Sequence, residues 1–223
     1  MPIAPAALIA ALDDAAGSLE ALVFAMRRAV RDAVSVEGAI SASAVERDQR
    51  AVHGLAWFAT YARAVRELAA YAARLEADEA FGETEQLITL IGAGEYCAQV
   101  FGGIAISQGE VVRPADCGID RAALRAFESP AIDRLVTTGT GAHARARLAA
   151  LIGAGDPQGL VGASGLDETM EAIRDQMRRF ARAEVTPHAH RWHRDNAYIP
   201  LAIIEGLGEM GVFGLTIPEA YGG

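Results

Sequence analysis

Apolar residues recur every three or four positions along most of the chain, which is the spacing of a helix with one buried face. Residues 19–34 predict one amphipathic helix, and residues 44–76 predict a longer one whose apolar stripe contains many alanines. Small side chains on such a stripe allow a second helix to approach closely. Shorter helices are predicted at 85–103, 121–137 and 142–152. The pattern therefore indicates an all-α fold that begins with a helical bundle.

Residue types that favour caps and breaks separate these helices. The first sixteen residues are rich in alanine and proline and predict a loose arm. Gly38 is predicted to interrupt helical structure after the first helix, and Phe81-Gly82 after the second. Thr84 is the predicted cap of the third helix, because its hydroxyl can accept a bond from a free backbone N–H. Pro130 is expected to interrupt the fourth helix.

The last third of the chain predicts two helices and a buried turn. Asp167 is a capping residue type, and the apolar residues that follow it at helical spacing are Met170, Ile173, Met177 and Phe180. Pro187 lacks an N–H, so the first helix is expected to end or kink there. Pro200 suits the start of the second helix, and Gly211 suits its end. Residues 212–218 are apolar and are predicted to be extended, and 221–223 predict a turn.

The composition supports a folded, acidic protein. Hydrophobic residues make up 52% of the 223-residue chain and charged residues 22%, which allows a sizeable core and argues against disorder. The formal net charge is −9, and every basic residue is arginine. This balance argues against a nucleic-acid partner, because phosphate contacts need a basic face.

The cysteines and the first residues give no indication of secretion or of a membrane. Cys97 and Cys117 follow no metal-binding or redox spacing, so we interpret them as free, partly buried thiols of a reducing compartment. The N-terminal segment lacks a positively charged start and contains Asp13 and Asp14, unlike a signal peptide. No uncharged apolar run reaches the ~20 residues that span a bilayer. We therefore expect a cytoplasmic protein.

Two features of the predicted bundle could serve either packing or a ligand. Aromatic residues widen the apolar surface of the long helix and favour core packing over a cofactor box: Trp57, Phe58, Tyr61 and Tyr71. Glycine inside a helix costs about 0.5–1 kcal/mol relative to alanine, so another helix or a ligand is expected close to Gly92, Gly94, Gly102 and Gly103. Gly92-Ala-Gly94 is not a dinucleotide fingerprint, because it has no third glycine and no preceding strand.

Histidine and carboxylate clusters have simple structural interpretations. His188, His190 and His193 are the most ligand-like group, but no nearby cysteine or paired carboxylate completes a zinc site, so metal binding is the less favoured alternative. Carboxylates gather at Asp13-Asp14 and between 76 and 85, near predicted helix ends. There they suit the helix dipole and solvent.

The order of markers in the last quarter of the chain resembles the start of an acyl-CoA dehydrogenase. The markers are Arg-Phe-Ala-Arg-Ala-Glu-Val-Thr-Pro187, then Pro200, then Leu207-Gly-Glu-Met-Gly211-Val-Phe-Gly214-Leu, then Ile217-Pro-Glu-Ala-Tyr-Gly-Gly223. This flavin-dependent family opens with a helical domain of the same spacing and an ending like Pro-Glu-Glu-Tyr-Gly-Gly. Ala220 departs from that ending, at a turn position and not at a catalytic one.

A second stretch resembles the C-terminal helical domain of the same family. There a Gln-x-Phe-Gly-Gly-x-Gly motif ends a helix and lies against the flavin of a neighbouring subunit. Gln99, Phe101, Gly102 and Gly103 match it, whereas Ala105 replaces the third glycine. Backbone N–H groups at such glycines can reach a pyrophosphate. The resemblance makes Gln99, Gly102 and Gly103 weak candidates for cofactor binding, with a degenerate copy that serves packing alone as the alternative.

The resemblance also implies how the chain is divided. Residues 46–114 resemble the additional helical region that one branch of the family, which acts on methylsuccinyl-CoA, carries ahead of the standard dehydrogenase. We therefore expect a helical extension over 1–152 that resembles a degenerate C-terminal bundle. A Gly-rich linker over 153–165 and an incomplete N-terminal helical domain over 166–223 are expected to follow.

The family's chemistry is removal of an α-proton by a carboxylate base and transfer of the β-hydride to flavin. The resemblance implies FAD, a short branched acyl-CoA substrate, electron-transferring flavoprotein as acceptor and a homo-oligomer. In the family, the base and most flavin contacts lie beyond the motif that ends here at Gly223. We therefore assign no catalytic and no metal-binding residue and expect this chain to be inactive by itself, as the front part of a longer enzyme. A free-standing helical interaction or oligomerisation module is the alternative.

Overall fold

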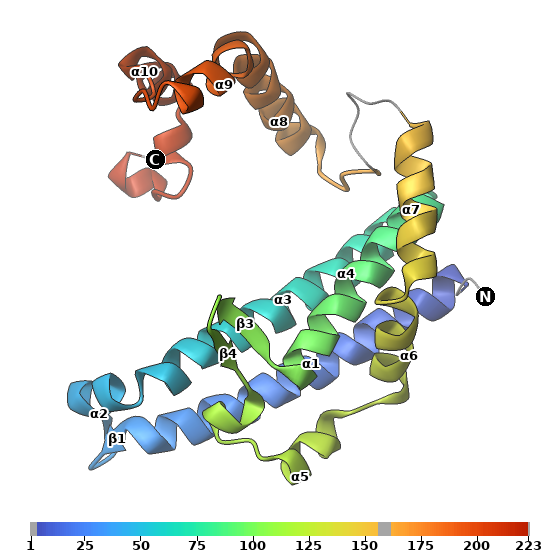
Figure 1. Cartoon of the computed structure of the whole chain (residues 1–223), viewed down its shortest axis with the longest axis vertical. Coiled ribbons are helices and arrows are strands. Elements are labelled where there is room, and N and C mark those ends of the chain that lie inside the picture. Colours follow the sequence, from blue (N-terminus) through green and yellow to red (C-terminus); the bar gives the residue numbers. More distant parts are fainter. Residues whose placement is uncertain (1–3, 156–161, 223) are drawn as a thin grey trace. The chain divides into compact units, whose positions relative to one another are not determined.

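The chain is almost entirely helical in the computed structural model, which describes residues 4–155 and 162–222 (Figure 1). Within those residues, strands occur only as two short hairpins. The prediction of an all-α fold is therefore confirmed. The chain divides into two compact units, the bundle unit (Met1–Gly165) and the C-terminal unit (Leu166–Gly223). The roles assigned above to the extension and the linker stay predictions.

The first helix, α1 (Pro5–Val34), begins well before residue 19. Pro5 lies in its first turn, where the missing N–H leaves no hydrogen bond unmade. Leu8, Leu12 and Leu19 are at most 1% exposed. The predicted loose arm is therefore wrong from Pro5 onward, because Ala11, Ala15 and Ala16 form one buried stripe with these leucines.

The predicted long helix is two helices, α2 (Ala42–Arg47) and α3 (Gln49–Ala77), which are separated at Asp48. Ser41 caps α2, since its hydroxyl accepts a hydrogen bond from the backbone N–H of Ala44. Helices α1 and α3 then pack along their length as the longest pair of the bundle unit (Figure 1).

Two antiparallel hairpins join the helices. β1 (Ser35–Val36) pairs with β2 (Ala39–Ile40), and β3 (Ile104–Ser107) pairs with β4 (Glu110–Val112). The hydrophobic pattern predicts neither, because such short strands are too brief to show a period of two. The paired residues Ile104 and Val112 are fully buried, so the second hairpin closes one side of the core.

Two helix starts differ from their predicted positions. α4 (Glu83–Gly102) begins after Gly82, so Thr84 lies inside the first turn and is not its cap. α6 (Pro130–Gly139) begins at the proline that was expected to interrupt a helix, and Ser129 caps it. The shorter elements nearby are η1 (Pro114–Cys117), α5 (Arg121–Leu124), η2 (Arg125–Phe127) and α7 (Ala142–Ala154).

Contact with α6 explains the central glycine of α4. A Cβ atom on Gly94 would lie 2.5 Å from the carbonyl oxygen of Leu135 and 3.0 Å from the Cα atom of Gly139. Gly139 faces α4 in the same way, since its own Cβ would collide with the carbonyl group of Leu90. The two backbones touch at this crossing, as the glycine spacing predicts for a close helix neighbour.

The core of the bundle unit lies between α1, α3, α4, α6 and the second hairpin. Large side chains from all of these elements exclude water from the centre of the bundle. The following are almost completely buried: Leu8, Leu12, Leu19, Leu22, Met26, Phe58, Val65, Val100, Ile104, Val112 and Leu135.

The C-terminal unit is a succession of short helices: α8 (Glu168–Phe180), η3 (Ala181–Val185), α9 (Thr186–Arg194), α10 (Leu201–Glu209), η4 (Val212–Gly214) and η5 (Glu219–Tyr221). The predicted cap is confirmed, because the Asp167 carboxylate accepts a hydrogen bond from the backbone N–H of Met170 at 2.8 Å. η3 is a π-helical turn, and it places Pro187 in the first turn of α9. The irregularity expected before this proline is therefore present.

The end of this unit is coiled and exposed. Gly211 has a φ of +75° and follows α10, as predicted for a helix stop. Residues 212–218 are not extended, because backbone bonds such as Gly214 N–H to the Gly211 carbonyl coil them into turns. No side chain between 166 and 222 is buried, so the predicted buried turn is wrong. No helix in the described part of the chain is long and apolar enough to cross a membrane.

Candidate functional site

The three predicted cofactor-binding candidates lie together where α4 turns into β3. Gln99 is half-buried, and its side-chain oxygen accepts a hydrogen bond from the Tyr61 hydroxyl at 3.2 Å. Its side-chain amide donates to the carbonyl of Glu95 at 3.4 Å. Gly102 has open space around it, and Gly103 is the C-cap of the helix. The motif thus has one location, bordered by α3 and the second hairpin.

The hairpin accounts for the presence of glycine at 103. Its φ is +120°, which L side chains rarely adopt. A Cβ atom there would lie 2.7 Å from Val111 Cγ1 and 3.1 Å from Arg113 Cγ. The backbone N–H of Gly103 donates to the carbonyl of Gln99 at 2.7 Å. Local geometry therefore demands this glycine whether or not a ligand binds.

Gln99 and Gly103 do not fit the pyrophosphate of a flavin. A glycine that binds phosphate needs a backbone N–H that points at the ligand. The N–H of Gly103 and both ends of the Gln99 side-chain amide are already engaged within the chain. The geometry therefore favours the packing alternative at Gln99 and Gly103, whereas Gly102, which has open space around it, stays a weak candidate for cofactor binding.

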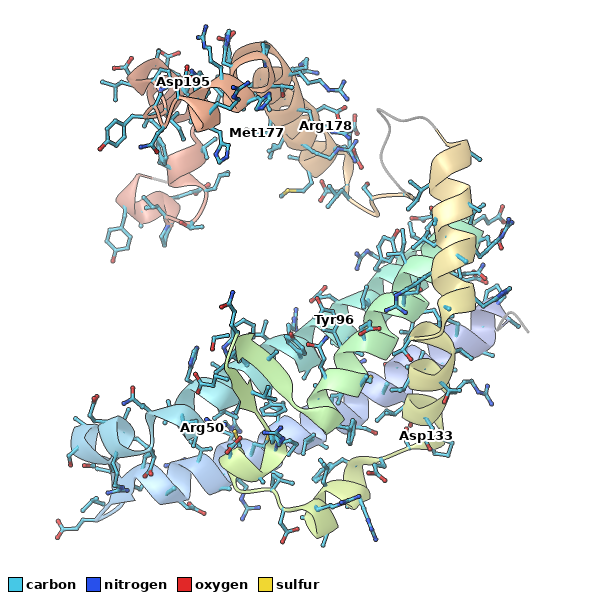
Figure 2. All side chains as sticks on the ribbon, viewed as in Figure 1. Arg50, Tyr96, Asp133, Met177, Arg178 and Asp195 are labelled. Carbon is cyan, nitrogen blue, oxygen red and sulfur yellow. The ribbon has the colours of Figure 1, made fainter. Side chains whose placement is uncertain are left out.

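A row of aromatic side chains lies beside this motif on the half-exposed face of α3. The Trp57 indole donates to Nε2 of His53 at 3.1 Å, and the ring centroids of Trp57 and Tyr61 are 6.2 Å apart. Tyr61 also packs edge-on against Tyr96 of α4, with centroids 4.8 Å apart. Figure 2 shows the position of Tyr96. Burial raises the pKa of the Tyr61 hydroxyl, which keeps it a hydrogen-bond donor. The row links α3 to α4.

Both cysteines are buried thiols with little nucleophilic character. Cys97 and Cys117 form no disulfide. Burial raises the pKa of Cys97 to about 12 and that of Cys117 to about 11. Because the thiolate is the nucleophile and the metal ligand, neither residue is prepared for catalysis at neutral pH. The prediction of free, buried thiols is confirmed.

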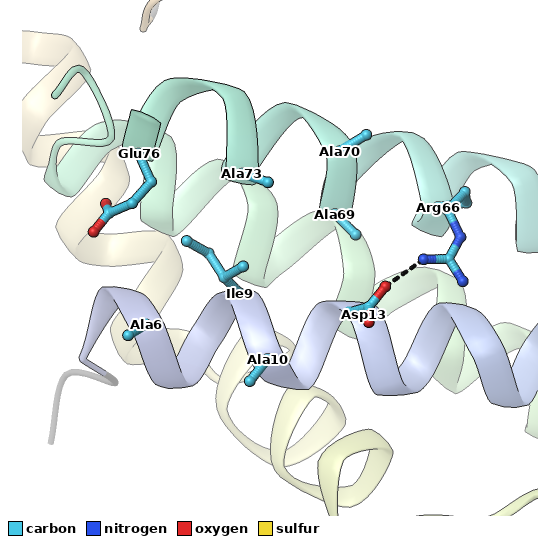
Figure 3. A pocket seen from close by; sticks show the side chains of 9 residues that line it. All are labelled: Ala6, Ile9, Ala10, Asp13, Arg66, Ala69, Ala70, Ala73 and Glu76. Atoms are coloured by element: carbon cyan, nitrogen blue, oxygen red, sulfur yellow. Dashed lines mark hydrogen bonds and ion pairs between the residues drawn. The ribbon is translucent and has the colours of Figure 1, made fainter. Parts of the chain in front are cut away.

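Arginines hold several of the carboxylates that gather near helix ends. Arg66 of α3 bonds Glu20 of α1 at 2.8 Å. It also pairs with Asp13 of α1 (Figure 3). Arg147 of α7 bonds Glu83 at 2.7 Å. The hydrogen bond from Arg66 lowers the pKa of Glu20. These pairs connect neighbouring helices and do not converge on one catalytic centre.

A groove of about 460 Å³ lies between α1 and α3. Figure 3 shows the side chains that line it. Its lining is mostly small and apolar: Ala6, Ile9, Ala10, Ala69, Ala70 and Ala73. The charged side chains that line it are Asp13, Arg66 and Glu76, and the first two pair with each other. The groove is therefore mostly apolar, and its charged groups are the Asp13–Arg66 ion pair and the carboxylate of Glu76.

Glu85 is the exception among the carboxylates. Its side chain is only 8% exposed, and Oε1 accepts a hydrogen bond from the backbone N–H of Ala163 at 2.7 Å. The predicted solvent-facing role is therefore wrong for Glu85. The hydrophobic pattern could not reveal this contact, because the partner lies far along the chain in a segment without periodicity.

The three histidines weighed as metal ligands lie on α9. The His188 and Trp192 rings are 5.6 Å apart. The step of two residues from His188 to His190 turns these two side chains toward different sides of the helix. In the residues that the structure describes, no group of three or more His, Cys, Asp or Glu side chains is placed to hold a metal ion.

The C-terminal unit exposes large apolar side chains. More than half of the surface of each of the following is exposed: Tyr198, Ile199, Leu201, Phe213, Leu215 and Tyr221. Most of them lie on α10 or on the turns that flank it. Large apolar patches on a protein surface mark places where another surface binds.

Comparison with known proteins identifies relatives for both units. Residues 167–223 match the family model "Acyl-CoA dehydrogenase, N-terminal domain". The chain is 47% identical over 216 residues to (2S)-methylsuccinyl-CoA dehydrogenase of Cereibacter sphaeroides, an alignment that covers 97% of this chain and 39% of that protein. It is 31% identical over 58 residues to glutaryl-CoA dehydrogenase of Desulfococcus multivorans, which is 26% of this chain and 15% of that protein. The chain thus spans well under half the length of these relatives.

Proposed function

We propose that this chain, which belongs to the acyl-CoA dehydrogenase family, forms the N-terminal part of a flavin-dependent enzyme that desaturates an acyl-CoA thioester. One observation carries the proposal: a single alignment at 47% identity runs through both units of the chain in the same order. The family match begins at residue 167, next to the start of the C-terminal unit. A chance resemblance of short helices would not extend across both units.

The proposed substrate is a short branched acyl-CoA such as methylsuccinyl-CoA. The relative that aligns with nearly the whole chain is named for that substrate, and it shares the helical region that precedes the family match. FAD as cofactor, electron-transferring flavoprotein as acceptor and a homo-oligomeric assembly belong to the same proposal, because they accompany the activity in the family. The proposal assigns neither the flavin site nor the carboxylate base to a described residue of this chain.

The part proposed for this chain is structural. The C-terminal unit would bind through the exposed apolar side chains around α10 to other parts of the enzyme. The bundle unit has its own core and would contribute packing or subunit contacts. Burying one large apolar side chain stabilises such an interface by about 1.5–3 kcal/mol, so a few of these residues are enough to hold it together.

The test is flavin reduction in the protein product of the complete reading frame that contains this chain. We expect the purified protein to show flavin absorbance and methylsuccinyl-CoA to bleach it without oxygen. Glutaryl-CoA, an unbranched dicarboxylic thioester, serves as the matched comparison and should bleach it more slowly. Absence of flavin, or no bleaching by any acyl-CoA, would contradict the proposal.

The 223-residue chain alone provides the second arm of the test. We expect it to be helical by circular dichroism and to show no flavin absorbance after purification. A yellow 223-residue protein would show that the chain holds flavin, against the assignment made from Gly103 and Gln99. Size-exclusion chromatography of both proteins then reports whether the bundle unit is sufficient for assembly.

A further inference from the structure

A short segment, residues 162–165, is bound to the helices of the bundle unit. Residues 162–165 are half-buried, and Ala163 packs against the core. The backbone N–H of Ala163 donates to Oε1 of Glu85 on α4 at 2.7 Å. Its carbonyl accepts a hydrogen bond from the Tyr71 hydroxyl on α3 at 2.5 Å. Two helices therefore hold one residue by both of its backbone polar groups.

The chemistry of these two side chains suits a permanent contact. Glu85 is a carboxylate with 8% exposure, and a buried carboxylate needs a donor to offset its lost hydration. The N–H of Ala163 is such a donor. Burial, and next the negative charge of Glu85, raise the pKa of Tyr71, so its hydroxyl keeps the proton that it donates.

The two glycines of the segment fit the same place. Gly162 has a φ of +81°, and a Cβ atom there would lie 3.1 Å from Oε1 of Glu85. Gly165 has a φ of +64°, and its Cβ would lie 3.1 Å from Cδ2 of Tyr71. Any other residue would be strained by its backbone and crowded by the side chains that make the hydrogen bonds.

We infer that residues 162–165 form a docked strap and that Tyr71 and Glu85 are positioning residues, which fix the point where the C-terminal unit leaves the bundle. A flexible linker over all of 153–165 would give end-to-end distances of about 20 Å. Because residues 162–165 are docked, the C-terminal unit begins directly after a segment that the bundle holds in place. This inference concerns chain attachment, and it holds whether or not the enzyme proposed above is correct.

Hydrogen exchange of the 223-residue chain, measured by mass spectrometry, tests the strap directly. We expect amides at 162–165 to exchange more slowly than a free peptide of the same sequence. Tyr71→Phe should raise their exchange rate about two- to tenfold, and Glu85→Gln about tenfold, because each removes or weakens one hydrogen bond. Exchange at the free-peptide rate in the unaltered chain would overturn the inference.

Matched variants separate the strap from general loss of structure. Tyr61→Phe alters a half-buried tyrosine on α3 that bonds Gln99, and Glu83→Gln alters an exposed carboxylate at the start of α4. Both should leave exchange at 162–165 unchanged. If they accelerate it as much as Tyr71→Phe and Glu85→Gln do, those two residues have no positioning role.

A glycine pair covers the case in which the first variants do not fold. Gly165→Ala strains the strap itself, whereas Gly153→Ala faces open space. We expect only the first to speed exchange at 162–165, with α3 and α4 still protected. It should also let residues 166–222 tumble more independently, seen as shorter correlation times from ¹⁵N relaxation. Unchanged exchange and tumbling in Gly165→Ala would contradict the strap.

Discussion

Helices with the same kind of apolar spacing have opposite surroundings in the two units. Helix α1 buries an entire stripe against its neighbours, including Leu12 and Leu19 at 0% exposure. Helix α10 has a comparable apolar face, yet Leu201 is 68% exposed and Ile204 39%. Amphipathic spacing therefore shows that a helix needs a partner surface and does not show that the partner lies in the same unit.

The two units also differ in the interactions that stabilise their helices. In the bundle unit, buried side chains and interhelical arginine pairs hold the helices. In the C-terminal unit, the features that define the helices are local: the Asp167 cap, the π-turn before Pro187 and the stop at Gly211. Local features set where helices begin and end but contribute little free energy compared with a core.

The largest expected effect tests whether the two units differ in how deeply they bury their leucine side chains. Leu19→Ala should lower the free energy of unfolding of the bundle unit by about 2–5 kcal/mol, because it leaves a cavity in a fully buried site. Leu201→Ala, the same change at an exposed site, should alter stability by no more than about 0.5 kcal/mol. Urea unfolding monitored by Trp57 fluorescence in a Trp192→Phe background measures the first change, and circular dichroism measures both. Equal effects would mean that the units do not differ in burial.

A glycine pair sharpens the comparison within the bundle unit. Gly94→Ala should destabilise it by about 1–3 kcal/mol, since the added methyl group meets the α6 backbone. Gly17→Ala, in an open position on α1, should stabilise it by about 0.5–1 kcal/mol through helix propensity. Thermal unfolding of both variants should shift in opposite directions, and a shift in the same direction would refute the close α4–α6 crossing.

The smallest expected effect concerns the ion pairs between α1 and α3. The Arg66 hydrogen bond lowers the pKa of Glu20. The pair therefore stabilises the folded state fully above the ordinary pKa of 4.5, and this stabilisation is lost as the pH falls through the lowered pKa. Because Glu20 is about half exposed, Arg66→Gln should cost less than about 1 kcal/mol at neutral pH. The cost should shrink as the pH falls below 4.5 and through the lowered pKa of Glu20.

Arg63→Gln is the matched control for this measurement. Arg63 pairs with Glu67 on the same helix, and both side chains are largely exposed. Its loss should cost only about 0.3 kcal/mol, because such a pair joins no second helix. If Arg63→Gln costs as much as Arg66→Gln, the contact between α1 and α3 adds nothing to the stability of the bundle.

Much of the fold could be predicted where one stretch of sequence contains its own signal. The stripe from Leu19 to Val34, the cap at Asp167 and the stop at Gly211 are all visible within a few residues. The start of α1 was missed because proline and alanine also occur in loose segments, and only burial of Leu8 and Leu12 distinguishes the two. The hairpin from Ile104 to Val112 was missed because it is too short for a period.

The candidate site shows the same limit more sharply. Sequence placed Gln99, Gly102 and Gly103 at the end of a helix, but only the fold shows that hydrogen bonds inside the chain occupy the groups a flavin would need. Tyr71 and Glu85 carry no motif, and their shared partner Ala163 is remote in the chain. A contact between distant residues leaves no pattern in either segment.

By itself the sequence determined the helical character of this protein, most helix ends and its resemblance to the acyl-CoA dehydrogenase family, because each depends on the order of nearby residues. Tertiary structure alone decided which apolar faces are covered, why Gly94 must be glycine and where the strap at 162–165 is held. The physical reason is range: caps and periodicity act within a helical turn, whereas burial depends on which distant segment arrives against a face.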